Sequence, residues 1–281
     1  MLGDLGDRRA VGAESPSARV WRVLSDGPND GPWNMAVDEA IAGAVGAGRV
    51  PPTVRFYTWG TPTVSLGCLQ AARGAVATEM WGQGGLSVVR RPTGGRAVLH
   101  DDELTYSVCV PLDGFWGRVS VTESFRLIGA GLVVGLRRLG VAATLGECGG
   151  GTARDRSAAC FQTPRMPAVL TAGRKLVGSA QRRWETALLQ HGSLLLSVDL
   201  EMHQAVFPAW PRDDPSRGVT WLKALLPEAP RRVDTERALM DGWAEVLGVR
   251  GGPGDLTGLE HQEAERLVVA RYGNPAWTWR H

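Results

Sequence analysis

Hydrophobic residues recur at helical spacing near both ends of this chain. Residues 35–45 are rich in alanine with apolar positions every three or four residues, which predicts a helix. Ser120 and Glu123 form the capping-box pattern that opens a helix, and we expect this helix to run to Leu139 and stop at Gly140. Two further helices are predicted over residues 234–247 and 260–272.

The middle of the chain is instead strand-like, with alternating apolar and polar positions and many β-branched side chains. A turn at Gly60, Thr61 and Pro62 separates the first two strands, and Ala172 and Gly173 are expected to close a hairpin. The predicted strands cover residues 53–57, 63–66, 87–91, 104–110, 168–171, 176–180 and 188–198. Strands in the middle and helices toward the ends predict an α+β (mixed α/β) fold around one sheet.

No internal repeat or low-complexity linker interrupts the chain after residue 20, which favours a single domain over residues 20–281. Residues 1–19 are polar, glycine-rich and of mixed charge, so we expect a flexible tail. This tail lacks the basic start and apolar stretch of a secretion signal. No apolar run approaches the roughly 20 residues that span a bilayer. The sequence therefore predicts a cytoplasmic protein with no membrane partner.

The composition is that of an ordinary globular protein, with 43% hydrophobic and 21% charged residues. The net charge is +2, and no basic run is interleaved with aromatic residues, so nucleic-acid binding is not supported. The four cysteines, Cys68, Cys109, Cys148 and Cys160, form no CxxC pair. We therefore expect free thiols rather than disulfides or a zinc site, and we expect neither a metal nor a cofactor.

Lysine is nearly absent from the chain. Of its 31 lysines and arginines, only Lys175 and Lys223 are lysines. An arginine cannot be deprotonated in a protein, whereas a lysine amine can lose its proton or follow a moving charge. Lys175 follows shortly after Cys160, which makes the pair a candidate for chemistry, with a plain lysine in a turn as the alternative.

A pair of glycines joins two of the predicted strands. Residues 90–101 read RRPTGGRAVLHD. Gly94 and Gly95 allow the backbone to adopt positive φ and to approach a ligand closely with its amide donors. A hairpin turn would explain two adjacent glycines by themselves, but it would not explain the residues around them.

This string closely resembles the RRx(S/T)GGxAVxHD signature of the lipoate and biotin protein ligase superfamily. Residues 34–40, 65–70, 173–181 and 190–194 match further motifs in the family's order. The resemblance covers roughly residues 20–200, and the C-terminal helices fit it more weakly. It implies a biotin/lipoate-ligase-like catalytic domain in which a central mixed sheet is flanked by helices.

The resemblance also implies a site that holds an octanoyl or lipoyl chain. The glycine pair would line the acyl slot, and the lysine of the Gly-Arg-Lys motif, here Lys175, would lie at the reacting carbonyl. The residues that the resemblance assigns to substrate binding are Arg91, Thr93, Gly94, Gly95, Arg96, Ala97, His100, Gly178, Ser179, Ala180 and His191.

Two features favour an acyltransferase over an ATP-dependent ligase within this superfamily. Ligases usually carry a third glycine after the pair and a Gly-Asn shortly after His-Asp, where this chain has Arg96 and residues 102–104 (DEL). Residues 157–164 (SAACFQTP) resemble the nucleophile loop of octanoyltransferases that use octanoyl-acyl carrier protein and glycine-cleavage H protein. The resemblance therefore implies octanoyl transfer from the carrier, through a thioester on Cys160, to a lysine of the H protein or of another lipoyl domain.

The chemistry of thioesters agrees with this interpretation. Exchange between thioesters is close to isoenergetic, so a cysteine can accept the acyl group without a nucleotide. A thiol with a pKa of about 8.5 is mostly protonated at neutral pH, and a nearby ammonium group favours the thiolate, so Lys175 is the natural activator. Backbone amides near the glycine pair or around Cys160 could hold the oxyanion.

Three other functions stay open. They are a lipoyl or octanoyl amidotransferase that works between lipoyl domains, an ATP-dependent lipoate-protein ligase, and a non-catalytic module that binds an acyl chain or a carrier protein.

Other reactive side chains are weaker candidates. Cys148 also lies in a glycine-rich loop and is the alternative nucleophile, whereas Cys68 and Cys109 fall within predicted strands and are expected to be buried. His100 and His191 could activate a thiol, but no Asn or Asp is obviously placed to orient either ring, which favours structural or acyl-site roles.

The remaining polar candidates are expected to be structural. His203, His261 and His281 are expected at the surface. Asp38 and Glu39 are neighbours on a helix and do not share a face, which favours capping or ion pairing over joint acid–base chemistry. Tryptophans could line an acyl tunnel, but most of the 11 are expected in the core.

Overall fold

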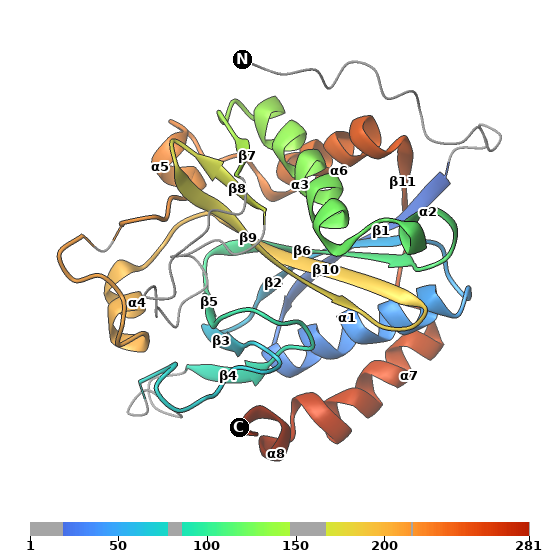
Figure 1. Ribbon diagram of the computed structural model, residues 1–281, viewed down its shortest axis with the longest axis horizontal. Coiled ribbons are helices and arrows are strands. Elements are labelled where there is room, and N and C mark those ends of the chain that lie inside the picture. Colours follow the sequence, from blue (N-terminus) through green and yellow to red (C-terminus); the bar gives the residue numbers. More distant parts are fainter. Residues whose placement is uncertain (1–18, 78–85, 147–166, 215, 281) are drawn as a thin grey trace.

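The computed structural model describes residues 19–77, 86–146, 167–214 and 216–280, which form two sheets with helices around them (Figure 1). The larger sheet has the strand order β11-β1-β2-β6-β10-β9-β8-β7. Its strands are β1 (Arg19–Asn29), β2 (Thr53–Trp59), β6 (Glu103–Pro111), β7 (Thr144–Gly146), β8 (Ala168–Thr171), β9 (Arg174–Arg183), β10 (Ala187–Leu195) and β11 (Val249–Pro253). Because β1 pairs in parallel with β2 and β11 while the other pairs are antiparallel, the sheet is mixed, as predicted.

The smaller sheet contains β3 (Thr63–Leu66), β4 (Ser87–Arg90) and β5 (Val98–His100) in the order β4-β3-β5. The expectation of a single sheet was therefore wrong. The strand β3 was predicted with the right bounds, but it pairs in parallel with β4 and antiparallel with β5, so its backbone groups serve the small sheet. This sheet carries the segment with the glycine pair, which leaves β4 and returns through β5.

Helices cover both faces of the larger sheet, with α3 and α6 on one face and α1 and α7 on the other (Figure 1). The helices are α1 (Gly31–Gly46), α2 (Gly114–Arg118), α3 (Val121–Arg138), α4 (Leu200–Val206), α5 (Leu222–Leu225), α6 (Arg232–Leu247), α7 (Gly258–Leu267), the π-helical turn η3 (Val268–Tyr272) and α8 (Pro275–Thr278). All four predicted helices are present. Among the described residues, no helix is both long and apolar enough to cross a bilayer.

Several helices and turns begin or end at the residues that the neighbouring sequence predicts. Ser120 Oγ accepts a hydrogen bond from the Glu123 amide at 3.1 Å, and the chain turns away after α3 at Gly140, whose φ is +86°. Ala172 and Gly173 both have positive φ, +47° and +75°, as a two-residue hairpin turn of type I′ requires. The predicted hairpin between β8 and β9 is therefore confirmed.

Two elements extend further than expected. The helix α1 begins at Gly31 because Asp30 Oδ1 caps it, accepting a hydrogen bond from the Trp33 amide at 2.8 Å. Arg19, which we assigned to the tail, is the first residue of β1, and residues 1–18 lie outside the described part of the chain.

Alternation along the central strands separates two environments. Val54 and Phe56 of β2 join the hydrophobic core beneath α3 and α6. Arg55 and Tyr57 face the opposite way, toward α1, where they are fully buried. The face of the sheet under α1 therefore carries buried polar groups, and this is where the candidate site lies.

The contact between α3 and α6 depends on glycines. A Cβ on Gly242 would lie 2.1 Å from the carbonyl oxygen of Gly131, far inside van der Waals contact with backbone. We expect Gly242→Ala to lower the free energy of unfolding by about 3 kcal/mol in urea titrations. The matched control is Gly43→Ala in α1, where a Cβ meets nothing within 4 Å, so stability should rise by about 0.5–1 kcal/mol. Equal effects of the two substitutions would contradict this account.

Candidate active site

The glycine pair lies against a second turn of the main chain. The amide of Cys68 donates to the Thr93 carbonyl at 2.8 Å. A Cβ on Gly67 would lie only 2.0 Å from the Gly95 carbonyl oxygen, and Gly95 itself has a φ of +92°. Only glycine fits at position 67, and position 95 also favours it, because the two turns touch through their backbones.

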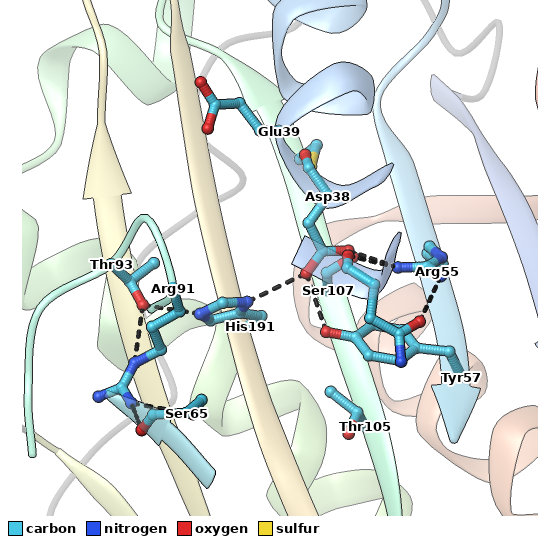
Figure 2. Close-up of polar contacts among 12 residues, drawn as sticks. Asp38, Glu39, Arg55, Tyr57, Ser65, Arg91, Thr93, Thr105, Ser107 and His191 are labelled. Carbon is cyan, nitrogen blue, oxygen red and sulfur yellow. Dashed lines mark hydrogen bonds and ion pairs between the residues drawn. The ribbon is translucent and has the colours of Figure 1, made fainter. Parts of the chain in front are cut away.

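Arg91 holds this arrangement from inside. Its side chain is buried, and its guanidinium donates to the carbonyls of Gly94 and Arg96 at 2.7 Å each and to the Ser65 carbonyl at 2.8 Å. Figure 2 shows the Arg91 side chain reaching Ser65 and Thr93. Arg91 therefore fixes the curvature of the glycine segment through hydrogen bonds to its main chain.

Asp38 orients His191. Asp38 is fully buried in α1, and its Oδ2 lies 3.0 Å from His191 Nδ1 (Figure 2). The same carboxylate accepts hydrogen bonds from Arg55 and Ser107 on Oδ1, at 2.9 Å each, and from Tyr57 on Oδ2 at 2.9 Å. Burial by itself raises the pKa of Asp38, but the hydrogen bond from His191 and the charge of Arg55 outweigh it, so the pKa lies below its usual value.

His191 in turn contacts the glycine segment. Its Nε2 lies 2.7 Å from Thr93 Oγ1. Burial lowers the pKa of His191 below its usual value, against the opposing effect of Asp38, so the ring is neutral at pH 7. With Nδ1–H donating to Asp38, Nε2 accepts the hydroxyl proton of Thr93.

A second buried carboxylate orients His100. Glu103 Oε1 lies 2.8 Å from His100 Nδ1, and His100 Nε2 lies 2.7 Å from Ser65 Oγ. Both histidines therefore have a carboxylate on one ring nitrogen and a hydroxyl on the other. The expectation that no Asn or Asp is placed to orient either ring was wrong for His191, because its partner Asp38 comes from α1. The partner of His100 is a Glu, which that expectation did not cover.

Between these two networks lies a small pocket. It is lined by Met35, Tyr57, Trp59, Ser65, Arg91, Val98, His100, Thr105, Gly178, Ser179, Ala180, His191, Gly192 and Ser193. Met35 lies in the matched motif of residues 34–40 but was not assigned to substrate binding. Tyr57, Trp59 and Thr105 lie outside every matched motif, although their alternation along β2 and β6 is a usable signal.

The predicted substrate-binding residues fall into two groups. Six of them line the pocket: Arg91, His100, Gly178, Ser179, Ala180 and His191. The others form the adjoining segment, where Thr93 and Ala97 are fully buried, Gly94 and Gly95 are exposed and Arg96 is half-buried. The pocket thus brings together residues from the separate motifs around residues 90–101, 173–181 and 190–194.

Lys175 lies near the start of β9, the strand that continues to the pocket residues Gly178–Ala180 in sequence. It is buried, and its backbone amide donates to Gly218 at 2.9 Å while its carbonyl accepts from Thr220 at 3.0 Å. Cys160 and Cys148 lie outside the described residues. Within the described ranges, no group of three or more His, Cys, Asp or Glu side chains is arranged to hold a metal ion.

The other two cysteines, Cys68 and Cys109, differ in burial. Cys109 is buried in β6, as expected. The same expectation was wrong for Cys68, which lies just after β3 and is half-buried, with its Sγ 3.1 Å from Arg280 Nη2 and 3.8 Å from Arg182 Nη1. The strand β3 ends at Leu66, just before Gly67, whose backbone must approach Gly95 closely.

The other polar candidates are structural. His203 is buried and its ring centroid lies 4.6 Å from that of Trp210, so a surface position was wrong, whereas His261 is exposed. His281 lies outside the described residues. Asp38 and Glu39 point in different directions (Figure 2), and Glu39 pairs with Arg271, as the helix geometry predicted.

Comparisons with known proteins place these features in context. Residues 30–243 match the family described as "Lipoyl protein ligase A/B catalytic domain". Proteins named Octanoyltransferase LipM, from Kyrpidia tusciae and Symbiobacterium thermophilum, are 45% and 40% identical over 275 residues, covering 93% and 92% of this chain and 99% and 98% of their own.

Two solved structures share the fold. A lipoate-protein ligase A bound with ATP is 25% identical with a TM-score of 0.79, covering 92% of this chain and 98% of that one. A bipartite lipoate protein ligase from Thermoplasma acidophilum is 25% identical with a TM-score of 0.76, covering 92% of this chain and 96% of that one.

The buried Asp38 carboxylate makes the site sensitive to substitution. We expect Asp38→Asn to lower the free energy of unfolding at pH 7 by about 3–5 kcal/mol, because it leaves Arg55 short of a buried counter-ion. Because the folded pKa is depressed, this contribution is present above about pH 4 and is lost as the pH falls through the folded pKa. Urea titrations at several pH values measure both effects.

The matched control for Asp38→Asn is Glu245→Gln, which breaks an exposed pair with Arg138 and should change stability by less than about 0.5 kcal/mol. A loss below about 1 kcal/mol for Asp38→Asn would show that the carboxylate is not needed to compensate Arg55.

Proposed function

Because this chain belongs to the lipoyl protein ligase A/B catalytic domain family, we propose that it is a cytoplasmic octanoyltransferase. Its donor is octanoyl-acyl carrier protein, the acyl group passes through a thioester on Cys160, and the acceptor is a lysine of glycine-cleavage H protein or of another lipoyl domain. The observation that carries the proposal is the 45% identity, over 99% of its length, to a protein named Octanoyltransferase LipM.

The pocket supports an acyl substrate. It is narrow, it lies beneath α1, and the residues that line it come from both sheets. Its walls include the apolar side chains of Met35 and Val98 and the rings of Tyr57 and Trp59. An alkyl chain would bury its surface against these groups, gaining about 0.8 kcal/mol for each methylene removed from water.

The proposed transfer has two steps. In the first, the Cys160 thiolate attacks the carbonyl carbon of the octanoyl thioester, and the carrier's thiolate leaves. In the second, the amine of the acceptor lysine attacks the acyl-enzyme, the Cys160 thiolate leaves, and the amine loses a proton as the amide forms. Splitting the reaction in this way replaces one difficult step by two easier ones.

Lys175 is proposed to favour the thiolate and to lie at the reacting carbonyl. Its backbone is fixed by hydrogen bonds to Gly218 and Thr220, and the strand that holds it also supplies Gly178, Ser179 and Ala180 to the pocket. One strand therefore sets the distance between the backbone of Lys175 and the slot.

We expect Cys160→Ala to abolish transfer. The test mixes the protein with octanoyl-acyl carrier protein in the absence of ATP and follows the intact mass. The wild type should gain one octanoyl group that is labile to hydroxylamine, and Cys160→Ala should gain none, since no other group forms the acyl-enzyme. Cys148→Ala is the matched control and should keep the adduct.

Other outcomes identify the alternatives. Modification of a lipoyl domain only with ATP and free acid would indicate a ligase. An adduct formed only from an octanoylated or lipoylated domain would indicate an amidotransferase. Binding of the donor with no adduct and no transfer would indicate a non-catalytic module.

We expect Lys175→Arg to lower kcat of octanoyl transfer by about 100-fold although the charge is kept, since arginine changes the geometry and cannot release a proton. Lys223→Arg is the matched control. Lys223 is half exposed and pairs with Asp102 at 2.6 Å, so its replacement should leave kcat within about twofold. Near-native turnover of Lys175→Arg would mean that charge alone matters.

A further inference from the structure

The pocket proposed to hold the octanoyl chain has an unexpectedly polar wall. Side chains with hydrogen-bond donors form much of this wall, namely Trp59, Ser65, His100, Thr105 and Ser193. A donor that faced an alkyl chain without a partner would make the slot a poor site for it, since an unmet buried hydrogen bond costs about 1–3 kcal/mol. The direction of these donors therefore decides what the slot can bind.

Most of them point to one carboxylate that is not among the residues lining the pocket. Glu103 is 2% exposed, and its Oε1 accepts hydrogen bonds from Trp59 Nε1 at 3.1 Å, Thr105 Oγ1 at 2.5 Å and Ser193 Oγ at 2.6 Å. His100 Nδ1 lies 2.8 Å from the same oxygen. The wall's donors thus turn away from the slot and toward Glu103.

The rest of the wall is fixed in the same way. Ser65 Oγ lies 2.7 Å from His100 Nε2 and accepts from Arg91 at 3.1 Å. The rings of His100 and Trp59 stack with their centroids 3.9 Å apart and their planes 14° from parallel. These contacts leave the wall little freedom to turn a donor toward a ligand.

The groups of the wall keep the buried Glu103 carboxylate ionised. Burial raises the pKa of Glu103, but the charge of His100 and the hydrogen bonds outweigh it, so the group is ionised at neutral pH. Its Oε2 is also buried and has no hydrogen-bond partner in the part of the chain that the structure describes. The carboxylate is thus held through one oxygen by the donors of the wall.

We propose that Glu103 is a positioning residue that makes the slot selective for an apolar acyl chain, by taking up the hydrogen-bond donors of its wall. The inference rests on the proposed function, since it assumes that the slot holds the octanoyl chain.

The register of the larger sheet shows how far this wall lies from Lys175. Ser193 pairs with Gly178 of β9 on one side and with Thr105 of β6 on the other. Gly178 lies three residues after Lys175, which is roughly 10 Å along a strand. With the carbonyl at Lys175, the wall faces the part of the octanoyl chain that lies far from the reacting atoms.

The test compares binding of octanoate and 8-hydroxyoctanoate to the full chain by calorimetry, in the wild type and in Glu103→Gln. The amide oxygen is uncharged and accepts more weakly than the carboxylate, and the amide nitrogen adds donors of its own, so donors turn toward the slot. We expect octanoate to bind about tenfold more weakly and 8-hydroxyoctanoate to lose little, so that the preference for octanoate falls by about tenfold.

Equal weakening of both acids would overturn the inference, because a merely structural role does not change their ratio. Glu260→Gln is the matched control, since Glu260 is equally buried and pairs with Arg22 away from the pocket. It should leave the ratio unchanged, and a change of ratio there would also overturn the inference.

A second variant serves if Glu103→Gln does not fold. Replacing Thr105 by Val and Ser193 by Ala together removes two of the donors that Glu103 accepts. The ratio of octanoate to 8-hydroxyoctanoate affinity should stay within about twofold, and a change of that ratio by about tenfold would show that these hydroxyls contact the ligand themselves, which overturns the inference.

The failure of this inference is distinguishable from failure of the proposed function. If the wild type binds neither acid, the slot does not take an alkyl chain and the inference falls, whatever the mass experiment shows. If the acids are discriminated as expected but no octanoyl adduct forms on Cys160, the selectivity of the slot stands and the transferase does not.

Discussion

The carboxylate of Asp38 joins helix α1 to three neighbouring strands of the larger sheet. It accepts hydrogen bonds from Arg55 and Tyr57 of β2, Ser107 of β6 and His191 of β10. A buried charge is tolerated only when its hydrogen-bonding capacity is met, and here four donors from three strands meet it. Since each donor must be in place, α1 has one position over the sheet, and the roof of the pocket is fixed with it.

The glycine segment depends on that position. The Thr93 hydroxyl donates to His191 Nε2, and the Arg91 guanidinium donates to the carbonyls of Gly94 and Arg96. The small sheet carries the segment, but its curvature is set by side chains that reach it from β10 and from its own strand. A segment fixed in this way can present backbone amides to a ligand without reorganising, which is the property that an oxyanion site needs.

Local rules predicted the elements better than the site. The helix after Ser120 and the hairpin at Ala172 depend on a few adjacent residues, and both are confirmed. The partner of His191 lies 153 residues away on α1, a pairing that only the fold creates. The partner of His100, Glu103, lies only three residues away, but it is a Glu, and the expectation covered only Asn and Asp. The small sheet was missed because pairing between strands leaves no mark in periodicity.

Asp38, His191 and Thr93 have the connectivity of a hydrolytic triad, with a carboxylate, an imidazole and a hydroxyl in sequence. Burial argues against that use, since Thr93 is fully buried and its oxygen also accepts a hydrogen bond from Arg91. His100 is engaged on both ring nitrogens as well. With both imidazoles committed to holding the walls of the pocket, a thiol nucleophile needs another source of activation. Under the proposed function that source is Lys175, whose positive charge and position together favour the thiolate.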